Sequence, residues 1–150
     1  MTRQQKYPDT STFHWYNANP HNKYTDDCVI RAICTAMNKP WETVFTDLFE
    51  IGKHYGLMPT DKKCFERYLQ KNGWIKRQQP RKDDNTKYTG SEFCKILQHY
   101  DCEYMIEAYT DETVIANIGG HHIVAIIEGK VWDTWNSTNG CIGNYWTKKQ

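Results

Sequence analysis

The hydrophobic pattern changes its period once along the chain, and this change constrains the fold more than any other feature. Before residue 101, apolar residues recur at the three- and four-residue spacing of helices in these segments: 29–37, 40–51, 60–72 and 91–100. After it they tend to alternate or form short apolar runs, as in strands, in these segments: 102–108, 114–118, 123–127, 131–135 and 142–146. Helices followed by an antiparallel sheet are the pattern of an α+β protein.

The chain length limits how these elements can be grouped. A chain of 150 residues can bury one core but is too short for two ordinary domains. The segment 29–37 is apolar almost all round, which is typical of a central, buried helix. We expect a single domain over residues 1–150, with the following parts: an irregular N-terminal segment (1–26), a helical half (27–100) and a sheet half (101–150).

Charge and hydropathy exclude several classes of partner. With 19 Lys and Arg against 18 Asp and Glu, the formal net charge is +1, too small to attract nucleic acid or an anionic membrane. The longest apolar run, 123–127, is far below the roughly 20 residues that span a bilayer. The polar start, 1–7, has no secretory pattern. We expect a cytoplasmic protein that recognises a peptide or protein in a shaped site, without nucleic-acid or membrane partners; the oligomeric state stays open.

The six cysteines are the chemically notable residues. No two of them form a Cys-x-x-Cys pair, and nothing in the chain indicates an oxidising compartment, so we expect neither a metal site nor disulfides, and no cofactor. Most of these thiols are expected to be small buried hydrophobes. The question is whether one of them differs from the rest.

Cys28 is the thiol with a distinctive position, at the start of the central helix. Asp27 is a good N-cap residue and would place Cys28 in the first helical turn. There, unpaired backbone N–H groups and the helix dipole favour a thiolate, which is the nucleophilic form of cysteine. The carboxylates of Asp26 and Asp27 would repel a thiolate unless capping bonds and Arg31, one turn on, take up their charge.

His122 is the candidate base, in the first strand of a predicted hairpin. If the hairpin loop is 128–130, counting outward places His122 directly opposite Asn136, close enough for a side-chain hydrogen bond that would orient the imidazole. A two-residue loop would instead bring Asp133 to the His122 face, nearer the turn. We prefer Asn136 and keep Asp133 in reserve. His121, on the opposite face, is the alternative base if the register differs.

These residues together carry a resemblance to a known family. A cysteine that begins a buried helix, a later His-x-Val-Ala strand and an Asn or Asp that ends the next strand resemble the papain-like cysteine peptidase superfamily. The chain is more similar to the compact bacterial and phage branches, which include bacteriocin-processing peptidase-like and transglutaminase-like proteins, than to papain itself. The resemblance covers roughly residues 15–37 and 118–137.

The resemblance implies a fold and an assignment of roles. It implies a papain-like α+β domain in which the buried catalytic helix of the helical half packs on the antiparallel sheet. Cys28 would be the nucleophile, His122 the base and Asn136 the orienting residue, with Asp133 in reserve. Papain-like enzymes also place an amide side chain before the nucleophile to stabilise the oxyanion, where the family normally has Gln.

The implied activity follows from these roles, with two alternatives. Asn22 and Asn19 are the amides available as oxyanion donors before Cys28. The implied protein is a thiol-dependent hydrolase, a cysteine protease that cleaves peptide or isopeptide bonds through a thioester on Cys28. One alternative is a non-catalytic papain-like binding protein of bacterial or phage origin, which the two aspartates beside the thiol and the missing Gln favour. Another is an acyltransferase or amidase that uses the same Cys-His pair.

Overall fold

The computed structural model describes residues 1–98 and 113–149. Within these ranges the chain forms five helices and six strands, in this order: α1 (Arg3–Lys6), β1 (Phe13–Trp15), α2 (Cys28–Met37), α3 (Trp41–Tyr55), α4 (Lys62–Lys71), β2 (Trp74–Arg77), α5 (Gly90–Gln98), β3 (Thr113–Ile118), β4 (His122–Ile127), β5 (Lys130–Asp133) and β6 (Ile142–Lys148). The predicted α+β class is therefore confirmed. The strand expected over residues 102–108 lies outside the described residues.

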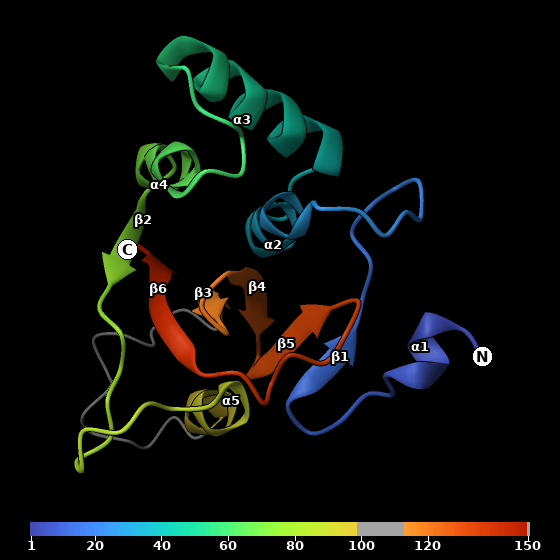
Figure 1. Ribbon diagram of the computed structural model, residues 1–150, viewed down its shortest axis with the longest axis vertical. Helices are drawn as coiled ribbons and strands as arrows, with labels where there is room; N and C mark the ends of the chain where they lie inside the picture. Colours follow the sequence, from blue (N-terminus) through green and yellow to red (C-terminus); the bar gives the residue numbers. More distant parts are fainter. Residues whose placement is uncertain (99–112, 150) are drawn as a thin grey trace.

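The strands form one mixed sheet, in the order β1-β5-β4-β3-β6-β2 (Figure 1). Neighbouring strands are antiparallel except for β1 and β5, which are parallel. The prediction of a purely antiparallel sheet confined to 101–150 is thus wrong. Both edge strands come from earlier segments, β1 from the part expected to be irregular and β2 from the helical half. They escape detection because strands of 3 and 4 residues are too short to show a period.

Helices cover both faces of this sheet (Figure 1). The helices α2, α3 and α4 lie over one face, and α5 lies over the other. One cluster of buried side chains joins α2, α3 and α4 to the first face through Ile115, Ile123 and Trp146. A second cluster, around Phe93 of α5, fills the opposite face. As its all-round apolar pattern predicts, α2 is the central helix, and it lies against β4 and β3.

The predicted helices are all present and differ mainly at their ends. The second one continues to Tyr55 rather than stopping at residue 51, and it ends where Gly56 adopts a left-handed φ of 68°. This helix, α3, is the longest at 15 residues. No helix in the described part of the chain has the length and apolar character needed to cross a membrane.

The hairpin of β4 and β5 has a shorter turn than predicted. Ile127 pairs with Lys130, so the loop consists of Glu128 and Gly129 only, and the predicted three-residue loop 128–130 is wrong. Both loop residues have positive φ, 52° and 74°, as a type I′ turn requires. Glu is an unusual residue for the first of these positions, which is why the sequence did not signal this turn. The shorter loop changes which residue lies on the side of His122.

Candidate active site

Cys28 is the first residue of α2, as predicted from its position after Asp27. Its side chain is half-buried. Asp27 is the N-cap residue by position, but its side chain makes no capping hydrogen bond. The backbone N–H groups in the first helical turn have no acceptor within the helix. They are therefore left available beside the Cys28 thiol.

The carboxylate of Asp27 is occupied by other side chains instead. It is buried, with 3% of its surface exposed. Its Oδ1 accepts a hydrogen bond from Arg31 Nε at 2.8 Å, while Oδ2 accepts from Asn19 Nδ2 at 3.1 Å and from Trp41 Nε1 at 3.0 Å. The ion pair with Arg31 offsets the charge of Asp27. The repulsion that this carboxylate would otherwise exert on a Cys28 thiolate is reduced accordingly.

His122 begins β4 and lies between Cys28 and Asp133. Its Nε2 forms a hydrogen bond and ion pair with Oδ2 of Asp133, the last residue of β5. The imidazole also lies against Trp135, with 4.9 Å between the ring centroids. Because Nε2 is held by Asp133, Nδ1 is the nitrogen left to interact with Cys28, whose pKa His122 lowers. A thiol, an imidazole and a carboxylate are the groups that a nucleophile, a base and an orienting residue require.

Asp133 is itself held in place from a second side. It is 2% exposed, and its Oδ1 accepts hydrogen bonds from Arg31 Nη1 at 2.5 Å and from the backbone N–H of Thr134 at 2.7 Å. Burial by itself would raise the pKa of Asp133, but His122 and Arg31 outweigh it and lower that pKa. Asp133 is therefore an ionised partner for the imidazole.

Arg31 joins the two buried carboxylates of the site, since the same guanidinium contacts Asp27 and Asp133. Sequence reasoning assigned Arg31 only the task of offsetting the aspartates before the helix. Its contact with Asp133 was missed because the two residues are far apart in sequence. The available signal was its spacing: Arg31 is three residues after Cys28 and therefore on the same side of α2.

The pKa values of the Cys28–His122 pair shift in opposite directions. Burial alone would raise the pKa of Cys28, but hydrogen bonds from His122 and the Ile123 backbone, together with the charges of His122 and Arg31, lower it below its ordinary value. Burial alone would lower the pKa of His122, but hydrogen bonds with Asp133 and Cys28 raise it to about 9. These shifts favour a thiolate beside an imidazolium, which is a nucleophile paired with a proton donor.

The other described thiols lack such a setting. Burial raises the pKa of Cys34 to about 11 and that of Cys94 to about 12. Burial also raises the pKa of Cys64. Cys141 is exposed, and Cys102 lies outside the described residues. Of Cys28, Cys34, Cys64 and Cys94, only Cys28 has a lowered pKa.

Asn136, the preferred orienting residue, does not hold His122. Its Oδ1 accepts hydrogen bonds from the backbone N–H of Thr138 at 3.0 Å and from the Thr138 hydroxyl at 2.6 Å, so its side chain stabilises a turn after β5. The two-residue hairpin loop explains the difference, because it brings Asp133 to His122 in place of Asn136. The alternative base, His121, is exposed in the turn that precedes β4.

The two predicted oxyanion donors also differ from expectation. Asn19 is buried, and its amide donates to Asp27 while its Oδ1 accepts from the backbone N–H of His21 at 2.9 Å. Asn22 is exposed and has a left-handed φ of 55°. In the described part of the chain, no hydrogen bond joins either amide to Cys28. Asn19 therefore helps to hold the Asp27 carboxylate in place through a hydrogen bond.

A hollow of about 710 Å³ includes Asp27, the residue before the thiol, in its lining, although Cys28 itself does not line it. One of its walls is the outer face of α3, where Trp41 stacks on Phe45 and Phe45 stacks on Phe49, with centroid separations of 5.0 and 4.5 Å. Met58, on the loop after α3, also lines it and is 65% exposed. Exposed aromatic side chains in a hollow are typical of a binding surface.

Neither a search for metal ligands nor a comparison with known proteins adds to the description of the site. In residues 1–98 and 113–149, no group of three or more His, Cys, Asp or Glu side chains could hold a metal ion. Comparison of the chain with protein-family models, curated proteins and solved structures found no match. The site is therefore interpreted from its own geometry.

Proposed function

We propose that the protein is a thiol hydrolase of the papain-like kind, which cleaves amide bonds in peptides through a thioester on Cys28. The observation that carries this proposal is the arrangement of Cys28, His122 and Asp133, with a lowered thiol pKa and a raised imidazole pKa. A binding protein has no need of a buried carboxylate that holds a histidine against a half-buried thiol.

In the proposed reaction, the Cys28 sulfur attacks the carbonyl carbon of the substrate amide and forms a C–S bond. The tetrahedral intermediate then collapses, the C–N bond breaks, and His122 gives its proton to the departing amine. Water next attacks the thioester while neutral His122 accepts its proton; the C–S bond then breaks, which releases the acid and restores the thiolate–imidazolium pair. Asp133 supports both steps by fixing the imidazole and favouring its protonated form.

The oxyanion is expected to bind at the start of α2. The Asp27 side chain leaves the N–H groups of the first turn uncapped, so the backbone N–H of Cys28 can donate to an oxygen that develops negative charge. The side-chain donors predicted from the sequence are replaced in this proposal by backbone N–H groups. The positive end of the helix dipole acts in the same sense.

The substrate class is suggested by the hollow that Asp27 helps to line. Its aromatic wall, formed by Trp41, Phe45 and Phe49, suits an apolar or aromatic side chain of a peptide whose scissile bond lies at Cys28. Because Asp27 lines the hollow and Cys28 follows it in the chain, we expect one extended peptide to reach both. The proposed substrate is therefore a peptide or isopeptide with a large apolar residue near the cleaved bond.

Two measurements test the proposal together. Mass spectrometry after brief iodoacetamide treatment at neutral pH should show Cys28 alkylated at least about tenfold faster than the exposed Cys141, because only Cys28 is held near an imidazolium. A library of internally quenched peptides should contain substrates with apolar residues that the wild type cleaves and Cys28→Ala does not. Cys141→Ala is the matched control and should cleave them normally. Equal labelling of both thiols and no cleavage above the Cys28→Ala background would refute the proposal.

A further inference from the structure

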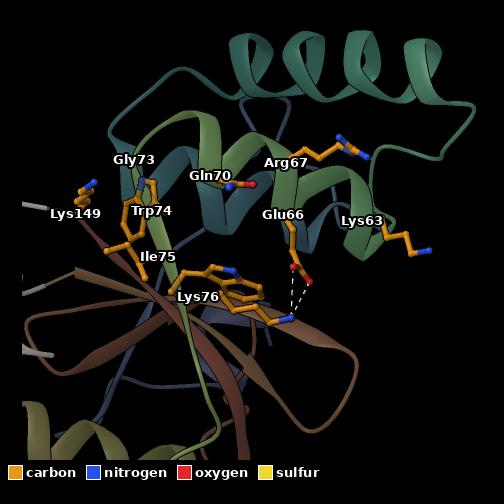
Figure 2. Close-up of a pocket in the computed structure, with 10 residues that line it drawn as sticks. Lys63, Glu66, Arg67, Gln70, Gly73, Trp74, Ile75, Lys76 and Lys149 are labelled. Atoms are coloured by element: carbon orange, nitrogen blue, oxygen red, sulfur yellow. Dashed lines mark hydrogen bonds and ion pairs between the residues drawn. The ribbon is translucent and has the colours of Figure 1, made fainter.

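A second hollow, of about 700 Å³, lies between α4 and β2, and we call it the basic groove (Figure 2). Four cationic side chains line it, Lys63, Arg67, Lys76 and Lys149. Glu66 is the one carboxylate in its lining, and it pairs with Lys76 at 3.3 Å. A chain with a formal net charge of only +1 thus gathers a local excess of positive charge in this groove.

The floor of the basic groove is apolar. It includes Trp74 and Trp146, which are 5% and 2% exposed, and the half-buried Ile75. The indole Nε1 of Trp74 is buried without a hydrogen-bond partner in the described residues. This atom is enclosed by the protein, so a ligand would meet only the exposed parts of the lining. The groove therefore suits a ligand with both acidic and apolar groups.

The strand β2 also offers backbone groups to a ligand. It is the last strand of the sheet and pairs only with β6 in the described part of the chain. Lys149 N donates to Gly73 O at 2.6 Å, which identifies this pair as a hydrogen-bonded position of the ladder. Because hydrogen-bonded and non-bonded positions alternate in antiparallel strands, the N–H and C=O groups of Trp74 and Lys76 point away from β6. Among the described residues, they form an edge along the groove that no other strand pairs with.

We propose that the basic groove binds an acidic peptide segment of another protein, which adds to the outer edge of β2 as an extended strand. The open backbone groups match a second peptide backbone, and lysines and an arginine beside them match carboxylates on alternate residues. A nucleic acid would use the charges but has no backbone N–H and C=O groups to continue the sheet. The proposal is independent of the thiol chemistry, since β3 and β6 separate β2 from β4.

The test uses fluorescence polarisation with a fluorescein-labelled octapeptide of alternating Glu and Val and the full-length Cys28→Ala chain, which cannot cleave the probe by the proposed reaction. Saturable binding is expected. The double variant Lys63→Glu/Lys149→Glu should raise the Kd by about tenfold or more. The matched control Lys87→Glu/Lys95→Glu makes the same charge change at exposed lysines outside the lining and should bind as before. Equal loss in both double variants, or no saturable binding, would overturn the proposal.

Strand addition is tested separately from charge. Lys76→Pro removes an outward N–H that the sheet does not use, whereas Lys76→Ala removes only the charge, so Lys76→Pro should bind more weakly than Lys76→Ala. The same octapeptide with alternate amides N-methylated should lose most of its affinity for the unaltered groove, a result that needs no variant of β2. If N-methylation has no effect, or if a single-stranded oligonucleotide binds more tightly than the peptide, the groove is a general polyanion site and the proposal is wrong.

Discussion

The two ends of α2 carry the same residue type with opposite chemistry. Cys28 in the first turn has a lowered pKa, whereas burial raises the pKa of Cys34 near the other end to about 11. Burial acts to raise the pKa of both thiols. The difference is that Cys28 has His122 within hydrogen-bonding reach, while the Cys34 thiol donates to the backbone oxygen of Arg31 at 3.4 Å. A thiol in this protein is activated by its neighbours in space.

The comparison also shows why a helix terminus alone is a weak indicator. The helix dipole favours a thiolate at Cys28, but burial opposes it. The imidazole of His122, which Asp133 holds in place, lowers the pKa of Cys28 and so favours the thiolate. Substitutions around Cys28 and changes of pH therefore separate the effect of its neighbours from that of the helix terminus.

Replacing the thiols one at a time should have the largest effect. Cys28→Ala is expected to lower the hydrolysis rate by about 10⁶-fold, as loss of a catalytic nucleophile does in related triads. Cys34→Ala should leave the rate unchanged and cost about 1 kcal/mol in the free energy of unfolding, because it removes one buried atom. Peptide cleavage and urea unfolding of both variants check this. A loss of activity in Cys34→Ala without unfolding would contradict the comparison.

Replacing the partner of the histidine should have the next largest effect. Asp133→Asn removes the charge that holds His122 and should lower the rate by about 10²- to 10⁴-fold. Asn136→Ala is the matched control, since Asn136 contacts Thr138 and should affect the rate little. Steady-state kinetics, with circular dichroism to verify folding, measure both. Equal losses in the two variants would mean that the contact between Asp133 and His122 does not orient the base.

The pH dependence should separate hydrolysis from alkylation. The pKa of His122 is raised to about 9, so hydrolysis should fall as the pH rises through that value and the imidazolium loses the proton that the leaving amine needs. Alkylation of Cys28 needs only the thiolate and should persist there. On the acid side, both reactions should fall as the thiolate is protonated, at a pH below the usual range for a thiol because the pKa of Cys28 is lowered. Pre-steady-state rates across the pH range check this, and parallel alkaline limbs would contradict it.

Arg31→Met should reduce stability by about 3–5 kcal/mol, because it leaves two buried carboxylates without their cation. Arg31→Lys should cost less, but one ammonium group is a poorer bridge between Asp27 and Asp133 than the guanidinium. Thermal and urea unfolding measure both variants. An Arg31→Met variant as stable as the wild type would show that the bridge does not contribute to folding.

The smallest effect is expected for Asn22, the exposed amide that the resemblance suggests as an oxyanion donor. Asn22→Ala should leave the rate within about twofold of wild type, whereas loss of a true oxyanion donor costs about 10²- to 10³-fold. Steady-state kinetics on a cleaved peptide give the answer. A loss on the larger scale would restore Asn22 to the site and would weaken the assignment of the oxyanion to the start of α2.

The helices and the core strands could be predicted because their hydrophobic periods are local. Five or more residues suffice to show a stripe or an alternation, so α2 to α5, β3 and β4 follow from the sequence within a few residues at their ends. The short edge strands β1 and β2 could not be predicted, because partners distant in sequence pair with them. Cys28 and His122 were likewise identifiable, since each stands at the start of a predictable element.

The sequence by itself determined that a thiol begins a buried helix and that a histidine enters a hairpin. Only the tertiary structure decided which residue meets that histidine. A two-residue turn at Glu128 and Gly129, in place of three, brings Asp133 rather than Asn136 to His122. The same Asp133 carboxylate also contacts Arg31 of α2, a residue distant in sequence. The physical reason is that the turn sets the register of the two strands. A shift of one residue in that register moves each side chain of a strand to the other face of the sheet relative to its partner.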